Sequence, residues 1–240
     1  MSTLTLVRHG QACAFSDSPD RLSPTGWAQA RALGRHWIEA GTRFDAAYHG
    51  TLRRQRESCE AVANEFRKAS VPFPEPEIHP GLNEYATQDL LTRIAPKVAG
   101  RDPEFAPLWH DWQTNPDRAG RNRRFQLMFE AIATRWVSGQ LGEPSLEPWD
   151  EFRSRALSAL LLIREANMGG RRAVAFTSGG PIGVAVQACL QSPPTAALEL
   201  NWRVRNTSLT TFLFSGARIS LDGFNELPHL SRKPDLVTFR

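Results

Sequence analysis

The sequence predicts a three-layer α/β protein, in which a mostly parallel central sheet carries helices on both faces. Short apolar, β-branched runs alternate with longer segments whose apolar residues recur at helical spacing. A chain of 240 residues with 41% apolar residues can bury a sizeable core, yet it is short for two full domains. We therefore expect one domain over residues 1–240, with residues 86–148 as a helical insertion.

The first strand is predicted at Leu4–Val7, where four apolar or β-branched residues precede a charged pair. This strand delivers Arg8 and His9 to its carboxyl end, and open α/β sheets bind ligands at that end. A guanidinium beside an imidazole suits an anion, and Gly10 allows the backbone to approach a ligand closely.

The next helix is predicted from Pro24 to about Ala40. Ser23 supplies a capping hydroxyl before a proline at the first helical position, and Gly41 ends the helix. The residues between His9 and this helix, Ala12–Arg21, form a polar loop.

A second strand and helix are predicted at Phe44–Tyr48 and Leu52–Lys68, with His49 at the lip between them. Three arginines lie in the first turns of that helix: Arg53, Arg54 and Arg56. Free N–H groups and the helix dipole favour an anion there, although solvent-facing charges would give the same pattern. Four prolines up to Pro80 predict extended chain, with Glu77–His79 as the third strand.

From Asp89 to Trp149 the pattern is helical and interrupted by prolines, which predicts two or three helices. We expect this insertion to form a cap over the crevice that chooses the leaving group of the substrate. Its tryptophans fit core packing better than a cofactor site.

The last third predicts a helix, a strand, a sharp turn into a second helix, and two edge strands. The ranges are Asp150–Asn167, Arg172–Thr177, Ser178 to about Leu190, Asn206–Phe214 and Arg218–Leu221. The first of these helices is amphipathic, and its inward residues are predicted to be Phe152, Ala156, Leu157, Leu160, Leu161 and Ile163.

Four segments in this order and spacing resemble the histidine phosphatase superfamily, also called the phosphoglycerate mutase-like family. They are Arg8–Gly10, Leu22–Ala30, Leu52–Ser58 and Leu82–Tyr85. The resemblance runs from Leu4 to about Leu230 and is weakest across the insertion. It implies the phosphoglycerate mutase-like fold and phosphoryl transfer to a histidine.

The resemblance implies a role for each matching residue. His9 would form a phosphohistidine, Arg8 and Arg54 would hold the phosphoryl group, and Glu84 would be the proton donor. Further phosphate contacts are expected from Ser178, the backbone N–H of Gly179, and Gln11. Arginines would supply the positive charge, so neither a metal nor another cofactor is expected. His229 is expected to be structural.

Ser178 departs from the family, which has a second histidine at this position. The following glycines and Pro181 keep the frame, so we interpret the serine as a real substitution in the pocket. Loss of one charge-assisted donor costs about 10²–10³ in rate at comparable oxyanion sites. His49 is a further candidate, as a replacement for the missing imidazole. A serine nucleophile fits less well, because Phe176 stands where the nucleophile elbow has glycine.

The favoured function is hydrolysis of a phosphate monoester, either a small molecule or a phosphoprotein. A mutase fits less well, because Cys13, Ala14 and Phe15 stand where a mutase has a polar binding loop. The alternative from another class is a phosphate-ligand or protein-binding module with a degraded site, which Ser178 suggests.

Composition limits the classes of binding partner and the cellular compartments that we expect for this protein. The net charge is only +4, and the densest basic segment, Arg118–Arg124, fits a solvated helix start better than a nucleic-acid contact. Three widely spaced cysteines argue against a disulfide framework or a zinc site and favour a reducing compartment. With no apolar run of membrane-spanning length and no room for a signal peptide before the first strand, a cytoplasmic location and no membrane partner are expected.

Overall fold

The computed structural model describes residues 1–13, 18–117 and 119–239. Ala14 and Phe15 of the predicted loop and Arg118 of the basic segment lie outside the described residues.

A six-stranded sheet in the order β3-β2-β4-β1-β5-β6 organises the described chain. Its strands are β1 (Ser2–Arg8), β2 (Ala46–His49), β3 (Pro76–Ile78), β4 (Arg172–Thr177), β5 (Leu209–Ser215) and β6 (Arg218–Glu226). The first four strands are parallel to one another, whereas β5 runs antiparallel to β1 and β6 antiparallel to β5. The prediction of a mostly parallel sheet is confirmed.

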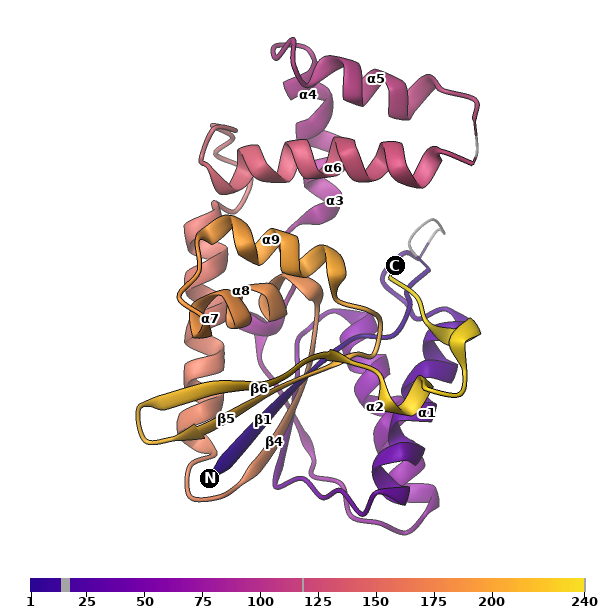
Figure 1. Ribbon diagram of the computed structural model, residues 1–240, viewed down its shortest axis with the longest axis vertical. Coiled ribbons are helices and arrows are strands. Elements are labelled where there is room, and N and C mark those ends of the chain that lie inside the picture. The colour runs from indigo at the N-terminus through magenta and orange to yellow at the C-terminus, as the bar shows by residue number, and fades with distance from the viewer. Residues whose placement is uncertain (14–17, 118, 240) are drawn as a thin grey trace. The chain divides into compact units, whose positions relative to one another are not determined.

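Helices cover both faces of this sheet (Figure 1). The long helices of the described chain as a whole are α1 (Pro24–Glu39), α2 (Arg53–Lys68), α6 (Arg121–Val137), α7 (Trp149–Ala166), α8 (Gly179–Cys189) and α9 (Pro194–Arg203). The shorter ones are α3 (Thr87–Asp89), a π-helical turn (Leu90–Ile94), α4 (Ala95–Ala99) and α5 (Ala106–Thr114), with 3₁₀ turns at Pro80–Leu82, Pro228–Leu230 and Pro234–Leu236.

Strand alternation divides the core into two clusters. Val7 of β1 packs with Leu33 of α1 and Val62 of α2 on one face. Leu6 of β1 packs with Ile182 of α8 on the other face, where α7 also contributes. Neighbouring residues at the end of β1 are therefore directed to opposite faces of the sheet, which decides how Arg8 and His9 are presented.

Two glycines hold the end of β1 against the start of α1. A Cβ on Gly10 would lie 2.6 Å from the carbonyl oxygen of Gly26, and a Cβ on Gly26 would lie 2.2 Å from the carbonyl oxygen of Gln11. The sequence predicted that Gly10 lets the backbone approach a ligand. In the structure, Gly10 also allows the backbone of α1 to pack against the end of β1. The cap of α1 is as predicted, since the Ser23 Oγ accepts a hydrogen bond from the Gly26 N–H at 3.1 Å.

Three details differ from the sequence prediction. The helix α9 was not predicted; it begins at the second residue of a Pro-Pro pair, a pattern that occurs in loops as well as at helix starts. The strand β6 continues five residues past Leu221, where the polar sequence of an edge strand lacks a clear alternation. On α7, Leu161 was predicted to face inward but is 44% exposed, because the buried residues Ala156, Ala159 and Ile163 follow the helical period and Leu161 lies on the opposite side of the helix.

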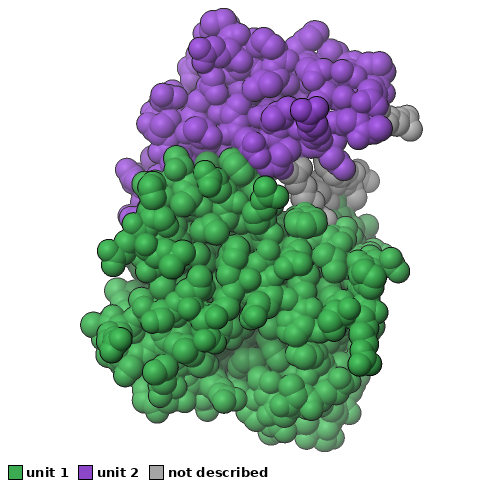
Figure 2. All heavy atoms as spheres, in the orientation of Figure 1, with its two compact units in different colours: residues 1–84, 155–240 green, residues 85–154 purple. Residues whose placement is uncertain are grey.

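The described residues form two compact units, Met1–Glu84 with Arg155–Arg240, and Tyr85–Ser154 (Figure 2). Aromatic rings make the core of the second unit, where Trp136 packs on Tyr85, Trp149 and Phe152 with centroid separations of 4.7–5.7 Å. These tryptophans serve packing, as expected. The role of this insertion in choosing the substrate stays a prediction.

Candidate active site

His9 follows β1 directly and is buried. Its Nδ1 lies 2.8 Å from its neighbour's carbonyl oxygen, on Gly10, and its Nε2 lies 3.1 Å from the Nε of Arg54. These partners assign the proton to Nδ1 and leave a lone pair on Nε2, to which Arg54 donates. Burial, followed by the charges of Arg54 and Arg8, holds the pKa of His9 well below its usual value of 6.5. The imidazole is therefore neutral near pH 7, as a nitrogen nucleophile must be.

Arg54 comes from the first turn of α2 and is held by Asp20, a residue that the sequence did not single out. Its Nη1 lies 2.5 Å from one oxygen of Asp20. The other oxygen of Asp20 accepts the backbone N–H of Arg53 at 2.7 Å. Asp20 thus caps α2, which has no cap from its own side chains. A carboxylate occupies the helix N-terminus at which the sequence predicted an external anion.

Ser58 ties the same helix to the end of β1. Its Oγ accepts the Gly10 N–H at 2.9 Å and donates to the Arg54 carbonyl oxygen at 2.7 Å. This single hydroxyl fixes the register between His9 and Arg54. Ser58 lay in the motif that suggested the family, but only the structure gives it this role.

Arg8 reaches His9 from the other side of the sheet. Its Nη1 donates to the carbonyl oxygens of Val204, at the end of α9, and of Phe239, the latter at 2.8 Å. The guanidinium is close enough to His9 to lower the pKa of the imidazole. Both predicted guanidinium groups therefore lie around His9, Arg54 in direct contact and Arg8 with its Nη1 held by backbone carbonyls.

Ser178 lies fully buried between β4 and α8, and its partner is Gln55, which follows Arg54 on α2. The Nε2 of Gln55 donates to the Ser178 Oγ at 2.8 Å and to the Leu82 carbonyl oxygen at 2.9 Å. Because the Oγ accepts from Gln55, its own hydrogen is left to donate elsewhere. Gln55 was missed in the sequence, where it reads as one more polar residue of an exposed helix.

Glu84 lies beside the start of α8. Both of its carboxylate oxygens are 3.1 Å from the backbone nitrogen of Gly180. Arg155 fixes the segment that carries Glu84, because its guanidinium donates to the carbonyl oxygens of Asn83 and Glu84 at 2.9 and 3.2 Å. Gly179 opens α8, and a Cβ there would lie 2.0 Å from the Asn201 Oδ1, so any other residue at this position requires the Asn201 side chain to move.

Two predicted residues are engaged in local contacts. The Gln11 Oε1 accepts from the Ser23 Oγ at 2.7 Å, which ties this side chain to the cap of α1. The His49 Nδ1 lies 2.7 Å from the Gly50 carbonyl oxygen, and His49 is buried. Within the described residues no hydrogen bond joins His49 to His9 or Ser178. That the His49 side chain acts in place of a second histidine stays a prediction.

The remaining charged and titratable candidates make local contacts within the fold. Arg53 pairs with the buried Glu57 at 2.6 Å, whereas Arg56 pairs with Glu60 at 3.3 Å on the exposed side of α2. His229 is buried against the Thr207 Oγ1 at 2.9 Å. Burial and the nearby His36 lower the pKa of His229 to about 3.

Among the described residues, no group of three His, Cys, Asp or Glu side chains has the arrangement of a metal site. None of the described helices combines the length and the hydropathy needed to cross a membrane. No disulfide bond joins Cys13, Cys59 and Cys189.

The chain matches the histidine phosphatase superfamily (branch 1) over residues 4–227. Among curated proteins it is 37% identical over 136 residues to the 2,3-bisphosphoglycerate-dependent phosphoglycerate mutase of Rhizobium etli, and 30% identical over 127 residues to that of Brucella ovis. The matched segments cover 52% and 48% of this chain, and 61% and 56% of those relatives.

Solved structures share the fold at lower identity. A phosphoserine phosphatase mutant from Entamoeba histolytica, in complex with phosphoserine, has a TM-score of 0.63 at 18% identity, covering 96% of this chain and 100% of that chain. Phosphoglycerate mutase from Bacillus anthracis has a TM-score of 0.64 at 17% identity, with 96% of each chain covered. A putative α-ribazole-5′-phosphate phosphatase from Escherichia coli has a TM-score of 0.62 at 18% identity, covering 94% and 98%.

Proposed function

This chain belongs to the histidine phosphatase superfamily, and from that membership and the geometry around His9 we propose that it hydrolyses phosphate monoesters through a phosphohistidine. The observation that carries the proposal is the hydrogen bond from Arg54 to the Nε2 of His9. It shows a buried neutral imidazole whose lone pair already faces a cation, which is the surrounding that an incoming phosphoryl group needs.

In the first step the His9 Nε2 attacks phosphorus, and the bond from phosphorus to the ester oxygen breaks. Glu84 gives its proton to that leaving oxygen. Arg54 turns from the lone pair of His9 to the phosphoryl oxygens, and Arg8 adds positive charge from the other side of the sheet. Charge that spreads over the phosphoryl oxygens in the transition state is stabilised by these two groups.

In the second step water attacks the phosphohistidine, and the bond from nitrogen to phosphorus breaks. The Glu84 carboxylate takes the proton of the attacking water and is ready for the next cycle. The hydroxyl of Ser178, oriented by Gln55, and the backbone N–H of Gly179 donate to phosphoryl oxygens in both steps, and Gln11 supplies a further donor.

Hydrolysis of p-nitrophenyl phosphate by the parent protein and by His9→Asn tests the proposal. We expect His9→Asn to abolish turnover and to remove an acid-labile, base-stable phosphoryl label from the protein during steady-state hydrolysis. The matched control is His110→Asn, which changes an exposed histidine of α5 and is expected to retain both signals. Turnover that survives in His9→Asn would exclude the covalent mechanism.

The substrate is proposed to be a small phosphate ester. The relatives named above are phosphoglycerate mutases, and one fold neighbour is described in complex with phosphoserine. Hydrolysis is favoured over transfer because of the apolar sequence after the first motif. Interconversion of 3- and 2-phosphoglycerate in the presence of 2,3-bisphosphoglycerate, faster than release of inorganic phosphate, would identify a mutase instead.

The hypothesis that His49 takes the role of the family's second histidine has its own test. If His49 contacts the phosphoryl group, His49→Ala lowers turnover of p-nitrophenyl phosphate and weakens inhibition by inorganic phosphate. Unchanged values for both would remove His49 from the site.

The binding-module alternative rests on Ser178, a serine where the family has its second histidine. Saturable phosphate binding that depends on Arg54, with no turnover across a panel of phosphorylated metabolites and phosphopeptides, would favour this alternative.

A further inference from the structure

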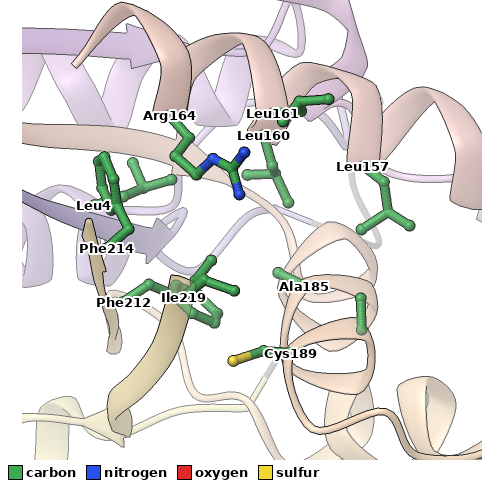
Figure 3. Close-up of a pocket in the computed structure, with 11 residues that line it drawn as sticks. Leu4, Leu157, Leu160, Leu161, Arg164, Ala185, Cys189, Phe212, Phe214 and Ile219 are labelled. Carbon is green, nitrogen blue, oxygen red and sulfur yellow. The ribbon is translucent and has the colours of Figure 1, made fainter. Parts of the chain in front are cut away.

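An apolar cavity of about 180 Å³ lies in the unit that contains His9, on the face of the sheet covered by α7 and α8 (Figure 3). Helix α7 contributes Leu157, Leu160, Leu161 and Arg164, helix α8 contributes Ala185, Ala188 and Cys189, and the sheet contributes Leu4, Phe212, Phe214 and Ile219. It borders the C-terminal half of α8, whereas Ser178 precedes the N-terminus of that helix.

The side chains that line this cavity are apolar, and some of them belong to the hydrophobic core. Leu4, Phe212 and Phe214 form a buried floor on the sheet. At the mouth, Leu161 and Ile219 are 44% and 41% exposed. Leu157, Leu160 and Leu161 lie outside the buried stripe of α7, which is formed by Phe152, Ala156, Ala159 and Ile163, and they line this open space instead. Apolar surface left in this form favours an apolar occupant.

A single cation interrupts these walls. The Nε of Arg164 is shielded from solvent and has no hydrogen-bond partner. Across the part of the chain that the structure describes, the Arg164 guanidinium has neither a hydrogen-bond acceptor nor an ion-pair partner. In Figure 3 its side chain leans from α7 toward the hollow, beside Leu160. A donor withdrawn from water without an acceptor costs free energy that a bound anion would recover.

We propose that this cavity binds an amphiphilic monocarboxylate, with its hydrocarbon body against the leucines and phenylalanines and its carboxylate on Arg164. An uncharged hydrocarbon would leave the Nε of Arg164 unsatisfied, and a compact inorganic anion would leave the apolar walls exposed. An engineered cavity of about 150 Å³ accommodates benzene, so this one holds a chain of roughly six to eight carbons. The site is separate from His9 and does not depend on the proposed function.

Calorimetric titration with octanoate tests the site, with 1-octanol as the uncharged probe of equal length. We expect saturable binding of octanoate at a 1:1 ratio, and binding of octanol at least tenfold weaker. Arg164→Met should lower the affinity for octanoate by about tenfold or more, because this change removes a charged donor and retains an apolar side chain of similar length. Arg67→Met, an exposed arginine on α2, is the matched control and should not change octanoate binding. Equal affinity for octanoate in the parent and in Arg164→Met would overturn the proposal.

Alkylation of Cys189 provides a second measurement of binding that is independent of calorimetry. In a Cys13→Ser background it is the remaining half-buried thiol, since Cys59 is buried and burial raises its pKa far above the usual value. Bound octanoate should slow alkylation of Cys189 by iodoacetamide at least tenfold, and Ala188→Phe, which fills the cavity, should abolish this protection. Alkylation that octanoate does not slow, or a concentration-dependent dimer that shields Cys189 without octanoate, would show that a small carboxylate is not the occupant.

Discussion

Asp20 occupies the place where the phosphoryl group of a substrate is expected, and its removal should strengthen phosphate binding. The change is Asp20→Asn, which retains an oxygen for the Arg53 N–H and removes the negative charge beside Arg54. A phosphate bound at Arg54 would lie next to this carboxylate. The negative charges of the phosphate and of Asp20 would repel each other, and the carboxylate also competes with phosphate for the hydrogen-bond donors of Arg54.

The size of the effect follows from distance and exposure. Two unit charges 4 Å apart interact by about 1 kcal/mol in water and about 4 kcal/mol at the effective dielectric constant of a protein surface. The side chains of Arg54 and Asp20 are 20% and 39% exposed, so the value lies between these two limits. We expect about 1–2 kcal/mol, which is roughly a 5- to 30-fold tighter binding of phosphate.

The assay is calorimetric binding of inorganic phosphate, supported by its competitive inhibition constant against p-nitrophenyl phosphate. Asp222→Asn, which neutralises an exposed carboxylate on β6, is the matched control for a general change in net charge. Phosphate affinity equal to or weaker than that of the parent in Asp20→Asn would refute the reasoning. It would show that Asp20 positions Arg54 for phosphate instead of competing with it.

Three further predictions concern buried groups. The acidic limb of kcat/KM for p-nitrophenyl phosphate should lie well below pH 6.5, because burial and two arginines lower the pKa of His9; a midpoint at 6.5 or above would contradict this. His229 binds a proton in the unfolded chain below pH 6.5 but in the folded protein only near pH 3, so its contribution destabilises the fold as pH falls through that range. The free energy of unfolding of His229→Gln should therefore depend less on pH between 6 and 4, by up to about 1.4 kcal/mol per pH unit, and parallel urea-denaturation profiles would exclude the effect. Gln55→Met and Ser178→Ala should each cost about 1–2 kcal/mol of stability. Their double-mutant cycle should give a coupling energy above about 0.5 kcal/mol, whereas additive costs would argue against the hydrogen bond.

The sequence predicted the sheet, the long helices other than α9, and the position of His9 because those features depend on local periodicity and caps. Ser23 before Pro24 is such a case, since a cap involves neighbours in the chain. The inward assignment of Leu161 was wrong although the same local periodicity applies. Leu161 is two residues from both Ala159 and Ile163, which are buried, so the helical period places it on the opposite side of α7.

The candidate site was predicted only in part. Arg54 was found through a motif, but Asp20 and Gln55 act across 34 and 123 residues, on Arg54 and Ser178 respectively. Nothing in the local pattern marks an aspartate in a loop or a glutamine on a helix as a partner. Such contacts require the fold before they can be seen.

The contact between Gln55 and Ser178 also makes these two positions dependent on each other. Ser178 has no exposed surface, and its hydroxyl lies 2.8 Å from the amide nitrogen of Gln55, so a larger side chain at position 178 needs Gln55 to move. A substitution at one of the two positions is therefore expected to be tolerated better when the other position changes with it.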